Sequence, residues 1–282
     1  MGQVKVVFLG SGGGRFAMVT QKRRTAGIRF LGDSFDVHLD PGPGALVHSW
    51  GAGLDPRKIN GVLVSHAHPD HYTDAEVLVE AMTAGATRRR GVLAAAKSVL
   101  KGSESIDPVI SRYHQSLPRL TVDVEGGTKF EIGKIAIFGA EARHSDVGTV
   151  GFRIETDVGS IGYTSDSEFY EDVCRSHRDV RVLILCVLRP SGEPWRGHMT
   201  TDDAIEIVND AKPELAVLTH FGMKMILRGP DDEARRVNKE TGVDVIAASD
   251  GMRMILDDTI GISQPKIQNR RLGLDRYLGN DG

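Results

Sequence analysis

Residues 61–71 read GVLVSHAHPDH, a short apolar run followed by three histidines and an aspartate within six positions. The apolar run predicts a buried strand, and Pro69 keeps the bend that follows it out of helical conformation. His66 and His68 are two residues apart, so extended backbone directs both imidazoles to the same side. Imidazole nitrogens and carboxylate oxygens are donors that zinc accepts. The stretch, with Asp70 and His71, therefore predicts a metal site between a strand and a helix.

The rest of the chain predicts an α/β protein. Residues 74–85 have helical apolar spacing, with a capping box at Thr73 and Glu76 and a stop at Gly85. Helices are also expected over 200–213 and 232–242, and strands in 4–10, 26–46, 120–145, 148–167, 180–188, 214–222 and 243–256. Residues 86–118 are the least legible part of the chain, where apolar patches and the stretch SLP suggest helices and turns. No repeat or linker divides the chain, which favours one domain over residues 1–262 and a polar, partly disordered tail over 263–282.

Composition limits the class of protein. The chain has 282 residues, 26% of them charged, and a formal net charge of −3, which argues against a nucleic-acid coat or an anionic-membrane binder. The cluster Arg88–Arg90 is most simply a solvated helix end. The two cysteines, Cys174 and Cys186, form no CxxC pair, so a cysteine zinc site is not expected. No export signal or long apolar run is present, and we expect no membrane partner and a cytoplasmic location.

A glycine-rich stretch, GSGGG at residues 10–14, follows the first predicted strand. A phosphate-binding loop is the alternative to a tight turn here. The stretch lacks the Lys-Ser/Thr pair of a nucleoside-triphosphate loop, and its spacing is not GxGxxG followed by a helix. We therefore expect a loop without a nucleotide.

Three further candidate ligands stand at the ends of predicted strands: His144 in ARHSD, Asp166 in GYTSDSE and His220 in VLTHFG. A lone histidine is more often a packed or surface residue than a ligand. Ligand sites in layered α/β folds gather at one edge of the sheets, however. Their shared position therefore favours a common site.

The motif HAHPDH, followed in order by His144, Asp166 and His220, resembles the metallo-β-lactamase superfamily, whose pattern is HxHxDH and then His, Asp, His. The upstream HLDPGPG, with Asp40, resembles the first aspartate motif of the same family. The similarity extends from about residue 40 to residue 220. It implies an αββα sandwich: two mixed β-sheets with helices on the outer faces. It also implies two divalent metal ions, most often zinc, although manganese and iron accept the same donors.

The resemblance assigns roles residue by residue. One metal would be held by His66, His68 and His144, the other by Asp70, His71 and His220, with Asp166 bridging both and Asp40 orienting the ligands. Asp70 would also count among the catalytic residues. A pair of cations lowers the pKa of a shared water, so the family likeness implies hydrolysis by a metal-activated water.

Two stretches resemble the phosphodiesterase branch of the superfamily, which contains tRNase Z and cyclic-phosphate diesterases: VVFLGSGGGR near the start, and RGHMTTDDAIEI. His198 would bind the scissile phosphate or protonate the leaving oxygen, with Glu168 orienting it. Alternatively, His198 merely precedes the N-cap of the next helix. Trp195 either lines a pocket or packs in a turn.

No tRNA-gripping arm is evident, so we expect a small or oligomeric phosphodiester, such as a cyclic nucleotide or oligonucleotide, as partner. Two alternatives remain open. One is hydrolysis of a carboxylic ester, thioester or lactone, and the other is a metal-bound protein that binds nucleic acid or a ligand without turnover. A homo-oligomer is compatible with every one of these interpretations.

Overall fold

The computed structural model describes residues 2–264, which form two β-sheets packed face to face. The first sheet has eight strands in the order β15-β14-β1-β2-β3-β4-β5-β6. Strands β3 to β6 pair in parallel, and the other pairs are antiparallel. The bounds are β1 (Val4–Phe8), β2 (Ile28–Leu31), β3 (Asp36–Leu39), β4 (Gly61–Val64), β5 (Val92–Ala96), β6 (Leu120–Val124), β14 (Arg253–Leu256) and β15 (Ile260–Ser263).

The second sheet has seven strands in the order β13-β12-β11-β10-β9-β8-β7. Strands β10 to β13 are parallel, whereas β7 to β10 form an antiparallel meander. The bounds are β7 (Lys129–Ile132), β8 (Ile135–Glu141), β9 (Val150–Thr156), β10 (Gly159–Tyr163), β11 (Val182–Cys186), β12 (Leu215–Thr219) and β13 (Asp244–Ala247). Each residue of β11 and β12 is buried, as expected of strands covered on both faces.

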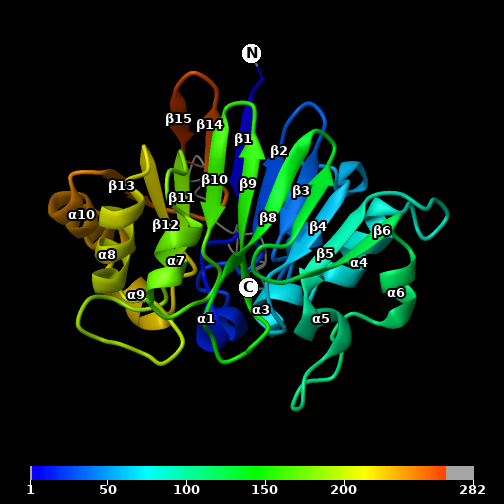
Figure 1. Ribbon diagram of the computed structural model, residues 1–282, viewed down its shortest axis with the longest axis horizontal. Coiled ribbons are helices and arrows are strands. Elements are labelled where there is room, and N and C mark those ends of the chain that lie inside the picture. The colour runs from blue at the N-terminus through cyan, green and yellow to red at the C-terminus, as the bar shows by residue number, and fades with distance from the viewer. Residues whose placement is uncertain (1, 265–282) are drawn as a thin grey trace, which may run out of the picture.

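Helices cover the outer faces of this sandwich (Figure 1). The core between the sheets joins Phe8, Phe30 and Leu63 of the first sheet to Ile137 and Phe152 of the second. A second core lies between the seven-stranded sheet and its helices. The helices are α1 (Gly14–Thr20), α2 (Ala45–Gly51), α3 (Pro69–Tyr72), α4 (Ala75–Met82), α5 (Lys97–Lys101), α6 (Arg112–Ser116), α7 (Glu171–Ser176), α8 (Thr201–Ala211), α9 (Met223–Arg228), α10 (Pro230–Thr241) and the 3-10 turn η1 (Pro56–Lys58). The expected αββα arrangement is confirmed.

A capping box is present at one helix and absent at another, where the sequence predicted it. Helix α8 begins at the N-cap Thr200, whose side chain accepts from the Asp203 amide in a full capping box. In contrast, the box expected at Thr73 is absent, because the Thr73 hydroxyl donates to the Pro69 carbonyl and α4 starts after Asp74. Pro69 starts the short helix α3 just upstream, and Thr73 closes that helix.

The unassigned region 86–118 holds β5, α5 and α6. Strand β15 runs to Ser263, one residue into the predicted tail, and residues 265–282 of that tail lie outside the described residues. Among residues 2–264, no helix has the length and apolar character needed to cross a bilayer.

Candidate metal centre

The candidate ligands gather at one edge of the sandwich, where α1, α3 and α9 also lie, at the bottom of Figure 1. Each one follows a strand: the HAHPDH segment follows β4, and its last two candidates lie on α3. The other three stand in the loops after β8, β10 and β12. Because β10, β11 and β12 pair in parallel, their carboxyl ends meet at the same edge. The structure therefore brings together all seven residues that the sequence analysis assigned to metal.

The first group of donors is formed by three histidines. His68 Nδ1 lies 3.0 Å from His66 Nε2 and 3.1 Å from His144 Nε2. Two donors of one tetrahedral zinc ion, each about 2.0–2.1 Å from the metal, are roughly 3.3 Å apart. The three nitrogens therefore have the separations of ligands of a single ion.

The second group has the same character. His220 Nε2 lies 3.0 Å from His71 Nε2 and 3.2 Å from Asp70 Oδ2. The distance between His71 Nε2 and Asp70 Oδ2 is 3.6 Å. Asp70 is held in place by the Gly14 amide, which donates to Asp70 Oδ2 at 2.6 Å.

Asp166 lies between the two groups. Its Oδ2 atom is 3.8 Å from His71 Nε2 and 3.8 Å from His144 Nε2. Its other oxygen, Oδ1, lies 3.1 Å from His220 Nδ1, and neither of these buried atoms forms a hydrogen bond among the described residues. One carboxylate oxygen is thus placed to face a member of each group.

The donor set fits cations better than it fits a network of hydrogen bonds. At least one of two facing imidazole nitrogens must carry a proton for them to bond, yet five histidines converge here in a largely buried space. Burial, followed by the proximity of His71, lowers the pKa of His66 and so favours its neutral, metal-binding form. Burial opposes protonation of His71, but Asp70, Asp40 and Asp166 raise its pKa to about 10. The same negative potential attracts cations.

Partners outside the two groups orient the imidazoles. His71 Nδ1 lies 2.8 Å from Asp40 Oδ2, and His144 Nδ1 lies 2.6 Å from the Gly197 carbonyl oxygen. The Ser65 hydroxyl donates to Asp40 and lies 3.0 Å from His66 Nδ1. In all three histidines a hydrogen-bonded Nδ1 leaves Nε2 directed into the centre. Asp40 therefore occupies the orienting position predicted for it.

His198 reaches the centre from a tight turn. Its amide donates to the Trp195 carbonyl at 3.1 Å, and Gly197, within the turn, has a φ of +77°. His198 Nδ1 lies 3.5 Å from Asp166 Oδ2, and the ring is centred 4.6 Å from that of His144. Burial lowers the pKa of His198 to about 4, although Asp166 acts in the opposite direction. His198 thus lies two residues before the N-cap of α8 and also lies next to two candidate metal ligands, Asp166 and His144.

Glu168 does not occupy the place predicted for it. No hydrogen bond joins its carboxylate to His198 in the described part of the chain, and its side chain is 39% exposed. Its ion-pair partner is Arg143, at 3.9 Å. Sequence proximity to Asp166 suggested the contact, but the backbone at Ser165, with a φ of +57°, turns the chain at this point. The orienting role assigned to Glu168 has no geometric support.

Several contacts of the centre were missed from the sequence. Tyr163 donates its hydroxyl to Asp40 at 2.7 Å across 123 residues, and the buried Cys186 lies beside Asp166 and His220. A Cβ atom on Gly13 would lie 2.1 Å from the His220 ring, so the glycine-rich loop packs directly against a ligand. None of these contacts has a local sequence signal, since each joins residues from different strands or loops.

An αββα sandwich with two groups of histidine and aspartate side chains at one edge defines the metallo-β-lactamase class of proteins. Residues 36–221 match the family described as "Beta-lactamase superfamily domain". The chain therefore belongs to this superfamily, as the motif predicted.

Relatives agree with this assignment. An uncharacterized protein of Methanocaldococcus jannaschii, MJ1374, is 40% identical over 256 residues, which cover 90% of this chain and 96% of the relative. A ribonuclease Z of Thermococcus sibiricus is 24% identical over 240 residues, covering 83% of this chain and 70% of that protein. The crystal structure of the metallo-β-lactamase fold protein YhfI from Bacillus subtilis superposes with a TM-score of 0.75 at 19% identity, over 93% of this chain and all of YhfI.

Proposed function

We propose that the protein is a metal-dependent hydrolase that cleaves a phosphodiester. The observation that carries this proposal is the position of Asp166 Oδ2, 3.8 Å from a donor of each ligand group and 3.5 Å from His198. The arrangement supports two cations side by side with a histidine next to them. The similarity to a ribonuclease Z supports a phosphodiester as the substrate.

Two divalent cations fit the donor set, and the predominance of imidazole nitrogens favours zinc or iron over manganese. His66, His68 and His144 would hold one cation, and Asp70, His71 and His220 the other, with Asp166 shared between them. When bound, such a pair supplies Lewis-acid polarisation of the phosphoryl oxygen and makes a water acidic enough to react near neutral pH.

His198 supplies the chemistry that the ligand residues cannot. Its low pKa keeps the imidazole neutral near pH 7 in the free protein. An arriving phosphodiester brings a negative charge close to the ring, which favours the protonated form. His198 then hydrogen-bonds the phosphate or delivers its proton to the leaving oxygen. Asp70 acts by positioning: its carboxylate is held by Gly14 on one side and faces His220 on the other.

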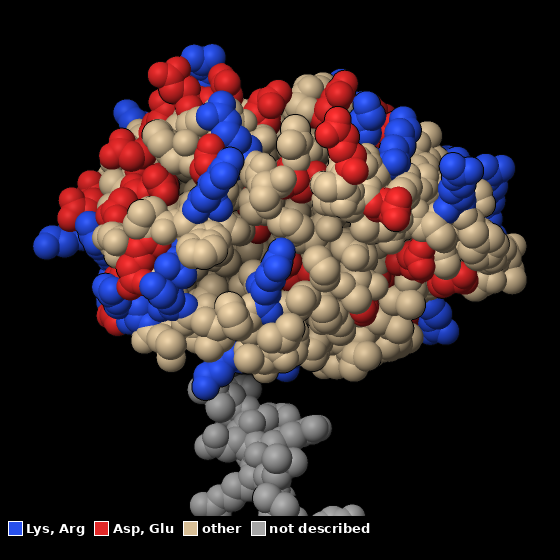
Figure 2. All heavy atoms as spheres, turned by 90° about the horizontal axis from the view of Figure 1, so that it is seen from below, with Lys and Arg blue, Asp and Glu red and all other residues tan. Residues whose placement is uncertain are grey.

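The surface around the centre supports a small substrate. Figure 2, seen from below Figure 1, shows acidic and basic side chains interspersed around a broad uncharged area, with no continuous basic stripe on the visible face. A polyanion such as a folded RNA is usually held by clustered Lys and Arg side chains. A cyclic nucleotide or a short oligonucleotide is therefore the substrate class that we propose.

The test is a substrate comparison on protein loaded with zinc or manganese. Bis(p-nitrophenyl) phosphate should be hydrolysed faster than a lactone or a thioester. The variant His198→Ala should lose about 100-fold or more of kcat on the phosphodiester while its metal content stays unchanged, because His198 belongs to neither ligand group. Faster cleavage of a carbon ester, or loss of metal in His198→Ala, would contradict the proposal.

A further inference from the structure

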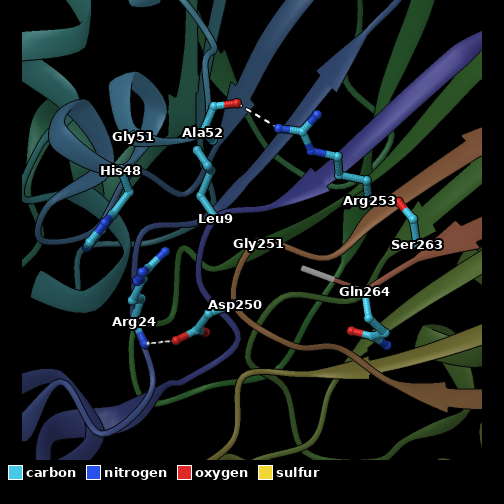
Figure 3. Close-up of a pocket in the computed structure, with 10 residues that line it drawn as sticks. All are labelled: Leu9, Arg24, His48, Gly51, Ala52, Asp250, Gly251, Arg253, Ser263 and Gln264. Carbon is cyan, nitrogen blue, oxygen red and sulfur yellow. Dashed lines mark hydrogen bonds between the residues drawn. The ribbon is translucent and has the colours of Figure 1, made fainter. Parts of the chain in front are cut away.

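A cavity of about 440 Å³ lies apart from the metal centre (Figure 3). It is bounded by the end of β1, the C-terminal end of α2, the turn before β14 and the end of β15. None of its lining residues belongs to the ligand groups. They are Leu9, Arg24, His48, Gly51, Ala52, Asp250, Gly251, Arg253, Ser263 and Gln264.

Three basic side chains line this cavity, and most of their donors are free. The side chains of Arg24 and His48 make no hydrogen bond or ion pair with any residue in the range 2–264. Arg253 donates from Nη2 to the Ala52 carbonyl at 2.7 Å, and its other guanidinium nitrogens are without partners among the same residues. Figure 3 shows Arg24 and Arg253 on opposite sides of the hollow. The cavity therefore offers unused hydrogen-bond donors from two directions.

Asp250, the one acidic residue that lines the cavity, is hydrogen-bonded to groups other than the guanidinium groups. Asp250 accepts hydrogen bonds from the Ser11 amide at 2.9 Å, the Ser11 hydroxyl at 2.8 Å and the Arg24 amide at 2.9 Å. These bonds tie the carboxylate to backbone and hydroxyl groups and leave both guanidinium groups without a carboxylate partner. Burial and the nearby Arg24 guanidinium lower the pKa of His48, while Asp250 and Asp74 act in the opposite direction.

We propose that this cavity is a binding site for a small phosphate monoester. A tetrahedral phosphate presents oxygens in several directions and can accept from the free guanidinium donors on either side of the cavity, whereas a planar carboxylate is matched by a single guanidinium fork. The apolar walls at Leu9 and Ala52 leave room for a small organic group, and the volume lies within the range of ligand pockets. The site does not depend on the reaction proposed for the metal centre.

One loop separates the two sites. Asp250 holds Ser11 from the side of the cavity, and the Ser11 carbonyl accepts from the Phe221 amide at 2.9 Å, next to the ligand His220. Phosphate is also a potential ligand of the metal centre. A test must therefore report on each site separately.

The two tryptophans of the chain allow binding at the cavity to be distinguished from binding at the metal centre. Trp50 lies beside Gly51 and two residues after His48, whereas Trp195 lies in the turn of His198. In the metal-loaded variant Trp195→Phe, the tryptophan fluorescence comes from Trp50 alone, which is adjacent in the chain to the lining residue Gly51. Glycerol 3-phosphate should change it in a saturable manner, and glycerol should not.

Charge-removing variants complete the experiment. In the Trp195→Phe background, Arg24→Gln and Arg253→Gln should each weaken binding at least tenfold, because a hydrogen bond to a charged group is lost. Arg235→Gln, which removes a charge on α10, should leave it unchanged. The Arg24 side chain makes no hydrogen bond or ion pair within residues 2–264, so Arg24→Gln tests the site even if Arg253→Gln perturbs the fold.

Three results would overturn the proposal: no saturable change in Trp50 fluorescence, equal affinity in Arg24→Gln, or equally tight binding of malate. In the variant Trp50→Phe, a response of Trp195 that survives Arg24→Gln would place the phosphate at the metal centre instead. Failure of the proposed phosphodiesterase activity would appear in the substrate comparison and would leave these titrations unaffected.

Discussion

The carboxylate of Asp40 lies 2.8 Å from Nδ1 of His71, although 31 residues separate them in the chain. Asp40 also accepts from the Ser65 amide, the Ser65 hydroxyl and the Tyr163 hydroxyl, each at 2.7 Å. Four donors thus converge on one buried side chain. Asp40 therefore orients the candidate ligand His71. Its hydrogen bonds to Ser65, which follows β4, and to Tyr163 of β10 connect it to both sheets.

Replacing Asp40 should therefore weaken metal binding. In Asp40→Asn the side chain loses its charge and one acceptor oxygen, so His71 is no longer held with Nε2 towards the centre. Loss of such a partner typically costs 10–100-fold in metal affinity. Zinc competition with a chromogenic chelator would measure it. Tyr163→Phe, which removes one of the four bonds, should have a smaller effect, and an unchanged zinc affinity in Asp40→Asn would refute the orienting role.

Gly13 should be intolerant of any side chain. Its backbone is extended, with a φ of −157°, so the constraint is close approach and not strain: an added Cβ would meet the His220 ring at 2.1 Å. Gly13→Ala should displace His220 and lower the metal content from about two ions to about one per chain. Gly51→Ala is the control, because nothing lies within 4 Å of its added Cβ. Elemental analysis after dialysis would measure the metal content of both variants. An unchanged metal content in Gly13→Ala would contradict the close packing of Gly13 against His220.

Trp195 should influence substrate affinity more than turnover. It is 61% exposed, it is joined to His198 by a backbone hydrogen bond, and the Arg189 guanidinium lies 5.6 Å from its ring centre. Stacking of a base on an aromatic side chain contributes about 1–3 kcal/mol. Trp195→Ala should thus raise KM roughly tenfold for thymidine 5′-(p-nitrophenyl) phosphate, with little change in kcat.

The matched substrate for this comparison is methyl p-nitrophenyl phosphate, which has the same leaving group and no base. Trp50→Ala is the matched variant, since Trp50 is also exposed and also lies near an arginine, 5.4 Å from Arg57. Equal losses on both substrates in Trp195→Ala would show that the indole only supports the turn.

His177 should make the fold sensitive to acid. It is fully buried, neither ring nitrogen is hydrogen-bonded to any of residues 2–264, and burial, assisted by Arg153, lowers its pKa to about 3. The unfolded chain has a histidine pKa near 6.5, so below that pH it binds the extra proton and stability falls as pH decreases. Between pH 7 and pH 5 this group should cost about 2 kcal/mol.

Urea unfolding of the wild type and of His177→Leu at both pH values would measure this contribution. The wild type should lose about 2 kcal/mol more than the variant over this range. Any cavity that the substitution leaves is independent of pH and cancels in the difference. Parallel pH profiles for the two proteins would show that His177 finds a proton-accepting partner.

The sequence predicted the main strands and helices and the candidate metal ligands because these have periodic or local signals. Continuous apolar runs such as 182–186 and 215–219 mark strands buried on both faces. The spacing of His66 and His68, with Pro69 after them, specifies a pair of imidazoles on one side of a loop. Helix α8 was also predicted, as the helix expected over residues 200–213.

The errors came from places where two local signals compete or where a contact is made at long range. Thr73 has the sequence of an N-cap, but a short helix ending at the same residue takes its hydroxyl. Glu168 follows Asp166 by two residues, yet its side chain pairs with Arg143 at the rim. Neither outcome is determined by the immediate neighbours of these residues.

By itself, the sequence determined which side chains could bind metal and on which strands they would be carried, because backbone geometry within a strand depends on adjacent residues alone. Only the tertiary structure decided that His144, Asp166 and His220 meet the HAHPDH loop, because strand pairing across the sheets sets which loop ends coincide. Strand pairing also formed the cavity that Arg24 and Arg253 line. These two arginines are 229 positions apart in the sequence and share no local pattern.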